Sequence, residues 1–167
     1  MQLPKIYKDA NLNLIKDKSI GIIGYGNQGR AQALNLLDSS MNVSIGLRKE
    51  SSSWKMAVDS GLNCTPVNEI VKDCDIISLL IPDQVMKEVY SENIEPHLTE
   101  GKTLLFSHGY NIHYNLIQPP KFINVVMAAP SGAGSELRKQ FKIGKGIPGL
   151  IAVHQDYSGD SFDIALS

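Results

Sequence analysis

The chain has 167 residues, 43% of them hydrophobic and 20% charged, which is typical of a single globular domain with a buried core. Its formal net charge of −1 and its scattered lysines disfavour a nucleic-acid partner or an anionic membrane surface, and they favour a small-molecule ligand. The N-terminus is polar and no apolar run approaches the ~18 residues that a membrane helix needs, so we expect a cytoplasmic protein.

Apolar segments rich in valine and isoleucine alternate along the chain with segments of helical spacing. The first pair is a strand over 19–24 and a helix over 28–37. Further strands are predicted over 43–47, 75–81, 103–106, 125–128 and 150–153, and further helices over 53–60 and 84–98. This alternation predicts an α/β fold, namely a doubly wound, Rossmann-type parallel sheet with helices on both faces.

Two segments of the C-terminal part have a different character. Segment 130–149 is rich in glycine and polar residues, and we predict a mobile loop there. Residues 158–167 begin like a helix and stop after barely two turns. We therefore expect one nucleotide-binding domain over residues 1–167, cut from a longer architecture at a domain boundary.

The stretch IGIIGYGNQGRAQALNL, residues 20–36, places three glycines at GxGxxG spacing between a strand and a helix. Taken alone, this spacing also fits a simple tight turn. In this context Gly24 permits the turn, Gly26 lets the backbone approach a pyrophosphate, and Gly29 lets the helix pack on the strand. Free N–H groups at the helix start then face the phosphates, so the segment predicts a bound dinucleotide.

The residues after the second strand indicate which dinucleotide is bound. In NAD-binding domains an acidic residue about 20 positions after the glycines accepts hydrogen bonds from the ribose 2′-hydroxyl. Here Arg48 stands at that place, and Ser51 and Ser53 add hydroxyl donors, a set suited to a 2′-phosphate. NADP is therefore predicted. The alternative is that Arg48 and Lys49 are solvated and that Glu50 holds the ribose of NAD.

Five segments, in their order and spacing, resemble the ketol-acid reductoisomerases: IGYGNQGRAQALNL, GLRKESSSW, LLIPDQVMKEVY, FSHGYNIHY and IPGLIAVHQD. The resemblance extends over about residues 6–156. It implies an oxidoreductase that reduces and isomerises acetohydroxy acids such as 2-acetolactate. Such an enzyme uses NADPH and magnesium on the path to valine, leucine and isoleucine.

The resemblance also implies which residues contact the cofactor. They are Tyr25, Gly26, Asn27 and Gln28 on the pyrophosphate turn, Arg48, Ser51 and Ser53 on the 2′-phosphate loop, Asp83, Gln84, Val85 and Met86 after the 75–81 strand, and Gly134. For Asp83, capping of the following helix is an alternative role that is compatible with cofactor contact.

His108, in FSHGYNIH, matches the family's active-site histidine at the end of a strand, where Gly109 gives the chain room to turn. An imidazole can donate or accept a proton near neutral pH, as a ketol-acid interconversion requires at its hydroxyl and carbonyl oxygens. Without the surrounding match, a histidine at a strand end is more often structural.

Two departures from the family concern the metal and the substrate. Ser131 stands where the family has a lysine near both, and a hydroxyl cannot replace that fixed positive charge. The family's C-terminal helical domain, which supplies the magnesium ligands, is expected to be absent, and no metal ligand is predicted within the chain. The two cysteines, Cys64 and Cys74, lack CxxC spacing and are predicted to be reduced packing residues.

Functions from different classes remain open. The first is the NADP-binding part of a ketol-acid reductoisomerase, with His108 in the active site and a separate helical domain or a homo-oligomer as partner. The second is a stand-alone NADP-binding module without turnover, which Ser131 favours. A weaker third is a different nicotinamide oxidoreductase that acts without metal on a small carbonyl compound.

Overall fold

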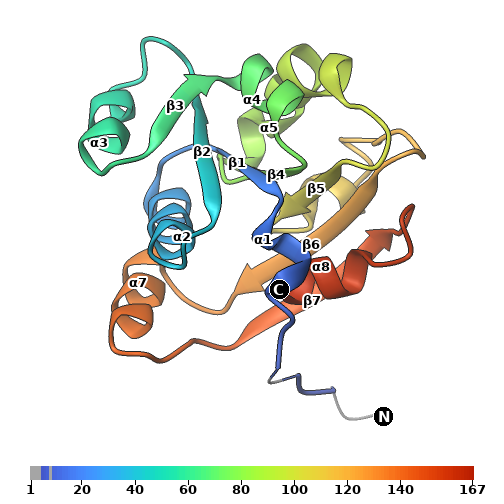
Figure 1. Ribbon diagram of the computed structural model, residues 1–167. Helices are drawn as coiled ribbons and strands as arrows, with labels where there is room; N and C mark the ends of the chain where they lie inside the picture. Colours follow the sequence, from blue (N-terminus) through green and yellow to red (C-terminus); the bar gives the residue numbers. More distant parts are fainter. Residues whose placement is uncertain (1–4, 8) are drawn as a thin grey trace.

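The computed structural model describes residues 5–7 and 9–167 (Figure 1). At its centre is a seven-stranded sheet with strand order β3-β2-β1-β4-β5-β6-β7. The strands are β1 (Ser19–Ile23), β2 (Asn42–Leu47), β3 (Asn63–Pro66), β4 (Ile76–Leu79), β5 (Thr103–Phe106), β6 (Asn124–Pro130) and β7 (Gly149–Gln155). The first six strands are parallel, so the doubly wound, Rossmann-type prediction is confirmed.

Helices cover both faces of this sheet. They are α1 (Asn13–Lys16), α2 (Asn27–Asp38), α3 (Ser53–Asp59), α4 (Val67–Asp73), α5 (Asp83–Val89), α6 (Tyr110–His113), α7 (Gly134–Lys142) and α8 (Ser161–Leu166). The helix predicted over 84–98 is α5 continued by a π-helical segment, η1 (Tyr90–Ile94), and a 3₁₀ turn, η2 (Glu95–His97). In the described part of the chain, every helix is too short or too polar to cross a bilayer.

The apolar residues of β1 alternate between two core layers. Ile22 packs in a cluster with Ala33 of α2 and Ala57 of α3, whereas Ile23 packs in a second cluster with Ile70 of α4 and residues of α5. Because successive side chains of a strand point to opposite faces, an unbroken apolar run buries both faces of the sheet. The run in β1 therefore needs helices on both sides.

The sheet departs from the predicted parallel arrangement at β7, which pairs antiparallel with β6. After β6 the chain forms α7 beside α2 (Figure 1), and the following loop returns to the carboxyl edge of the sheet. There the Ser131 N–H donates to the Pro148 carbonyl oxygen at 2.8 Å. Because the chain re-enters the sheet at the edge it had left, β7 must run in the opposite direction.

The prediction of a mobile loop over 130–149 is also wrong, because α7 occupies its centre. Arg138 joins this helix to α2. Its guanidinium donates to Asn35 Oδ1 at 2.9 Å and pairs with Asp38 Oδ2 at 2.7 Å. The helix is thus stabilised by residues about a hundred positions away, which a local pattern cannot reveal.

Candidate nucleotide-binding and active site

The glycine turn lies where β1 passes into α2. Gly24 has a φ of +101°, and a Cβ there would lie 2.6 Å from the Leu80 carbonyl oxygen. A Cβ on Gly29 would lie 2.3 Å from the Gly24 carbonyl oxygen, so helix and strand approach closely at this point. A Cβ on Gly26 would meet no atom within 4 Å. The turn is therefore tight against the protein at two glycines and open to a ligand at the third.

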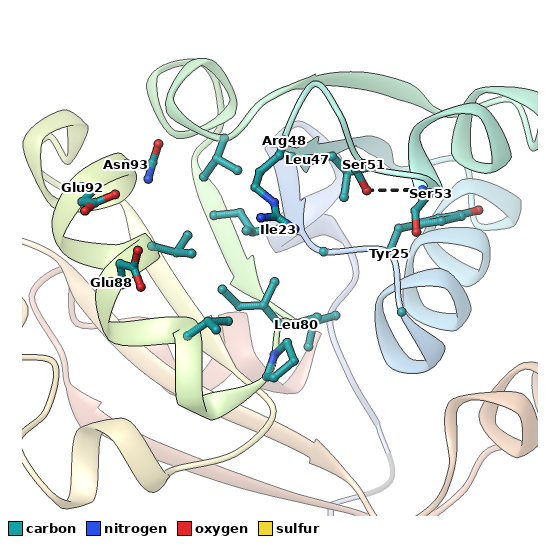
Figure 2. A pocket seen from close by; sticks show the side chains of 18 residues that line it. Ile23, Tyr25, Leu47, Arg48, Ser51, Ser53, Leu80, Glu88, Glu92 and Asn93 are labelled. Atoms are coloured by element: carbon teal, nitrogen blue, oxygen red, sulfur yellow. Dashed lines mark hydrogen bonds between the residues drawn. The ribbon is translucent and has the colours of Figure 1, made fainter.

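A cleft of about 550 Å³ opens beside this turn (Figure 2), within the size range of small-molecule sites. Its walls come from the glycine turn, the end of β2, the start of α3, and the α5–η1 helix. Of the predicted cofactor residues, the cleft brings together Tyr25, Gly26, Arg48, Ser51, Ser53 and Val85.

Arg48, Ser51 and Ser53 are held together by local bonds. The Ser51 N–H donates to the Arg48 carbonyl oxygen at 2.9 Å, and the Ser53 N–H donates to Ser51 Oγ at 3.3 Å (Figure 2). These bonds bring one guanidinium and two hydroxyls to the same cleft. Such a donor set suits a phosphate through charge-assisted hydrogen bonds.

Across the cleft from these serines lie Glu88, Glu92 and Asn93, which sequence reasoning missed (Figure 2). A signal was present, because Glu88 and Glu92 are four residues apart and share a helix face with Val85, itself a predicted cofactor residue. Carboxylates accept hydrogen bonds from amino groups and repel phosphates. The cleft thus has one wall suited to a phosphate and one that carries negative charge.

Two predicted cofactor residues bury their side chains in the core. Tyr25 is 5% exposed, and its ring extends away from Arg48 in Figure 2. Met86 is 3% exposed and packs in the core cluster that contains Ile23. At both positions, contact with a ligand falls to the backbone, so a role of either side chain in cofactor binding stays a prediction.

The remaining predicted cofactor residues, Asn27, Gln28, Asp83, Gln84 and Gly134, lie outside the lining of the cleft. Gln28 Nε2 donates to the Gly132 carbonyl oxygen at 2.8 Å, and a Cβ on Gly134 would lie 2.1 Å from the Asn27 carbonyl oxygen. These contacts join the glycine turn to the start of α7. They explain the glycine at position 134 by packing, and its contact with the cofactor stays a prediction.

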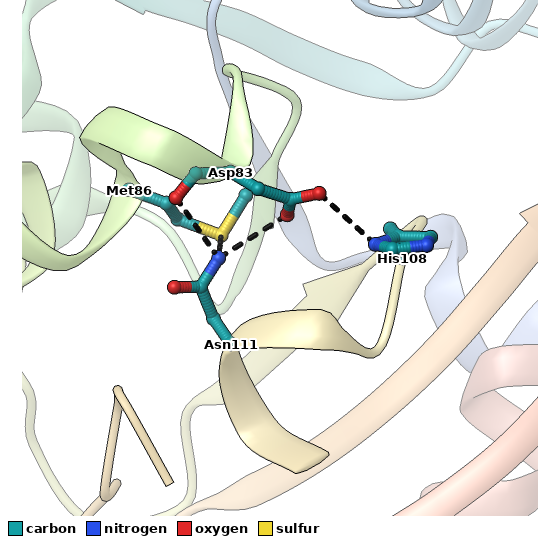
Figure 3. A network of polar contacts seen from close by, with 4 residues as sticks. All are labelled: Asp83, Met86, His108 and Asn111. Carbon is teal, nitrogen blue, oxygen red and sulfur yellow. Dashed lines mark hydrogen bonds and ion pairs between the residues drawn. The ribbon is translucent and has the colours of Figure 1, made fainter. Parts of the chain in front are cut away.

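His108 lies on the loop between β5 and α6, at the same edge of the sheet (Figure 3). Its Nδ1 lies 3.0 Å from Asp83 Oδ2, and Asp83 Oδ1 accepts a hydrogen bond from Asn111 Nδ2 at 3.1 Å. Pro82 occupies the N-cap position of α5 and Asp83 is the first helical residue, so Asp83 is not the capping residue. We call His108, Asp83, Asn111 and Met86 the His108 cluster. Sequence reasoning missed Asn111.

The residues whose pKa departs from its ordinary value lie mainly at the opposite, amino edge of the sheet. Burial alone would raise the pKa of Asp75, but the Ser19 N–H and hydroxyl donate to its Oδ2 at 2.8 and 2.7 Å, and the net effect lowers the pKa. Burial raises the pKa of Cys74 to about 11 and also raises that of Cys64, so both free thiols are neutral near pH 7. Cys74 lies in a core cluster and Cys64 packs against another, so their packing role is confirmed, whereas their redox state stays a prediction.

The sequence matches the family described as "Acetohydroxy acid isomeroreductase, NADPH-binding domain" over residues 14–167. The ketol-acid reductoisomerase (NADP(+)) of Methanocaldococcus jannaschii is 52% identical over 159 residues, which are 95% of this chain and 48% of that protein. Its counterpart in Sulfurisphaera tokodaii is 50% identical over 167 residues, 99% of this chain and 50% of that protein. The chain thus spans about half the length of the curated relatives it matches.

The structure of an NADH-preferring ketol-acid reductoisomerase from an uncultured archaean superposes on this chain with a TM-score of 0.92. The two are 40% identical, and the match covers 95% of this chain and 49% of the other. The family match includes the glycine turn, Arg48 and His108, and it confirms the resemblance carried by the five sequence segments. The chain therefore belongs to the ketol-acid reductoisomerase family and corresponds to its NADPH-binding domain.

Proposed function

We propose that this chain is the cofactor-binding part of an enzyme that reduces and isomerises acetohydroxy acids such as 2-acetolactate, in branched-chain amino-acid biosynthesis. The observation that carries the proposal is that the cleft and the His108 cluster adjoin. Pro82 lines the cleft, and the next residue, Asp83, contacts His108. In doubly wound sheets, ligands bind at this carboxyl edge.

NADP is the proposed cofactor. Arg48, Ser51 and Ser53 form a donor set for a 2′-phosphate, and the open face at Gly26 leaves room for a pyrophosphate. The two curated relatives are named as NADP(+) enzymes, whereas the superposed structure is of an NADH-preferring one. Family membership alone therefore does not fix the preference, and the proposal rests on this chain's own donors.

Bound NADPH would supply the hydride for the reduction. The chain's own residues would bind and orient it, with the N–H groups of the glycine turn available to the pyrophosphate and the Arg48 guanidinium available to the 2′-phosphate. His108 exchanges a proton with a substrate oxygen. Such general acid–base help contributes typically ~100- to 10,000-fold to a rate.

Magnesium, which the family resemblance implies, does not fit the residues described here. In residues 5–7 and 9–167, no three His, Cys, Asp or Glu side chains gather as a metal site, and Asp83 and His108 form only a pair. Magnesium prefers oxygen ligands, usually including carboxylates. We propose that the metal ligands come from a helical region outside this chain.

The test follows NADPH absorbance with 2-acetolactate and magnesium, for the chain alone and for the chain supplied with the remaining half of a relative. We expect the chain alone to bind NADPH without sustained turnover, and the combination to turn over unless it carries His108→Gln. Turnover by the chain alone would mean that its own carboxylates bind the metal. NADPH binding without turnover in both arms would favour the stand-alone binding module.

A further inference from the structure

Asp83 connects two groups in very different surroundings. Its Oδ2 lies 3.0 Å from Nδ1 of His108, whose side chain is 69% exposed. Its Oδ1 accepts from Nδ2 of Asn111, which is 0% exposed. A carboxylate at the start of α5 thus joins a buried amide to an imidazole at the surface (Figure 3).

The amide of Asn111 has a single favourable orientation. Its Nδ2 also donates to the Asp83 carbonyl oxygen at 3.2 Å and lies 3.4 Å from Met86 Sδ. All these partners are acceptors, so a flipped amide would place its oxygen against oxygen. Asn111 Oδ1 is buried and has no hydrogen-bond partner among the described residues, which costs stability. Packing alone would favour an apolar residue here, so we attribute the asparagine to its N–H groups.

An ionised carboxylate can only accept hydrogen bonds. A neutral His108 must therefore present Nδ1–H to Asp83, which leaves Nε2 unprotonated. When Nε2 takes up a proton, the same carboxylate stabilises the resulting imidazolium. A carboxylate behind a histidine fixes both the tautomer and the ring orientation in this way.

We propose that Asp83 is a positioning residue for His108, and that Asn111 holds Asp83 in place. The cluster keeps His108 in its Nδ1–H form with Nε2 as the atom that exchanges a proton. The proton exchange itself rests on the proposed function, whereas the tautomer follows from the contacts of Asp83.

The tautomer can be measured in the chain without substrate. Long-range ¹H–¹⁵N spectra of the ¹⁵N-labelled chain, recorded at a pH where His108 is neutral, distinguish Nδ1–H from Nε2–H, and His108→Gln identifies the resonance. We expect Nδ1–H in the wild type and loss of that preference in Asp83→Ala. Asp59→Ala, at an exposed aspartate that ends α3, is the matched control and should leave the His108 spectrum unchanged. Nε2–H in the wild type, or an unchanged tautomer in Asp83→Ala, would overturn the proposal.

Asn111→Leu tests the second link, since leucine keeps an apolar volume and removes both N–H groups. We expect a weaker preference for Nδ1–H, with circular dichroism reporting an intact fold. An unchanged tautomer would overturn the role of Asn111. If the leucine variant does not fold, Asn111→Ala takes its place, and Asp83→Ala decides on the first link in either case.

Turnover then separates this inference from the proposed function. With the remaining half of the enzyme supplied, Asp83→Ala should lower kcat for 2-acetolactate about 10- to 100-fold, as loss of such supporting partners does, with a smaller change in KM. In a His108→Gln background the same change should have little further effect. A changed tautomer with an unchanged kcat would overturn the positioning role in the reaction. An unchanged tautomer would overturn it whatever the turnover.

Discussion

The cleft and the His108 cluster lie at the same edge of the sheet but differ in how they are enclosed. The cleft has two walls and an apolar lining that includes Ile23 and Leu80. The His108 cluster rests on two buried residues, Asn111 and Met86, and its imidazole is largely exposed. Beside it lie the rings of Tyr110 and Tyr114, which are 45% and 60% exposed.

The two regions suit two different tasks, namely the proposed binding of the cofactor in the cleft and the proposed proton exchange at His108. The described residues form the walls of a cleft that we propose for the adenosine, whereas the His108 side chain is 69% exposed. Electrostatic stabilisation of a reacting group is strongest where water is excluded. The exposure of His108 therefore agrees with the proposal that a helical region from outside this chain completes the active site. Substitutions at four places would test how the cleft differs from the rest of the molecule.

The largest effect is expected from the glycine turn. Gly29→Ala should lower the free energy of unfolding by about 3 kcal/mol, because its Cβ would lie 2.3 Å from a backbone oxygen, and should weaken NADPH binding about 100-fold. Gly26→Ala is the matched control, since its Cβ meets no protein atom. It should weaken NADPH binding about tenfold or more and leave the melting temperature unchanged. Calorimetric titration measures NADPH affinity, and thermal melting measures stability. Equal losses of melting temperature in the two variants would contradict the assignment of Gly29 to packing and Gly26 to ligand approach.

Arg48→Ala should weaken NADPH binding by about tenfold or more and change NADH binding little, because a charged hydrogen bond contributes roughly 1.5 to 3 kcal/mol. The neighbouring exposed Lys49→Ala serves as control and should affect neither cofactor. Titration with both cofactors measures the difference. Equal losses for NADPH and NADH would rule out the 2′-phosphate assignment and favour Glu50 as a ribose ligand.

The wall of the cleft formed by Glu88 and Glu92 should weaken NADPH binding, in contrast to Arg48. Glu88→Gln combined with Glu92→Gln should strengthen NADPH binding about two- to fivefold at low salt, because two negative charges near an anionic ligand are removed, and the gain should fade at high salt. Asp17→Asn, an exposed change before β1 at the amino edge, should have no such effect. Weaker binding in the double variant would instead indicate that these carboxylates accept hydrogen bonds from the base.

The smallest effect concerns stability at the amino edge. Folding lowers the pKa of Asp75 below 3.8, so its carboxylate stabilises the fold above that pH, and the stabilisation is lost as the pH falls through the lowered pKa. Asp75→Asn should reduce the free energy of unfolding by about 1 kcal/mol at pH 7, with the difference shrinking as the pH falls below 3.8. Urea unfolding across this range tests it. Because this edge is remote from the cleft, a change in NADPH affinity would contradict the proposed location of the site.

Local sequence patterns were sufficient to predict features whose residues lie close together in the chain. The apolar run of β1, the glycines that follow it and the helical spacing of α2 occupy neighbouring positions, and Arg48 follows β2 directly. β3 and α4 were missed for a different reason. β3 has the sequence NCTP, which lacks the valine- and isoleucine-rich run of the predicted strands, and α4 follows it directly without a connecting loop. Glu88 and Glu92 were missed because an exposed acidic pair on a helix is usually a solvated face.

From the order of amino acids we obtained the Rossmann-type fold, the glycine turn, the donor set at Arg48 and the prediction that His108 is an active-site residue. Each depends on residues close together in the chain or on a family match. The direction of β7, the helix within 130–149 and the contact of Asp83 with His108 and Asn111 depend on residues that are distant in sequence. Pairing of this kind is set by packing of the whole sheet and its helices, which brings side chains 25 to 28 positions apart within hydrogen-bonding distance at one edge.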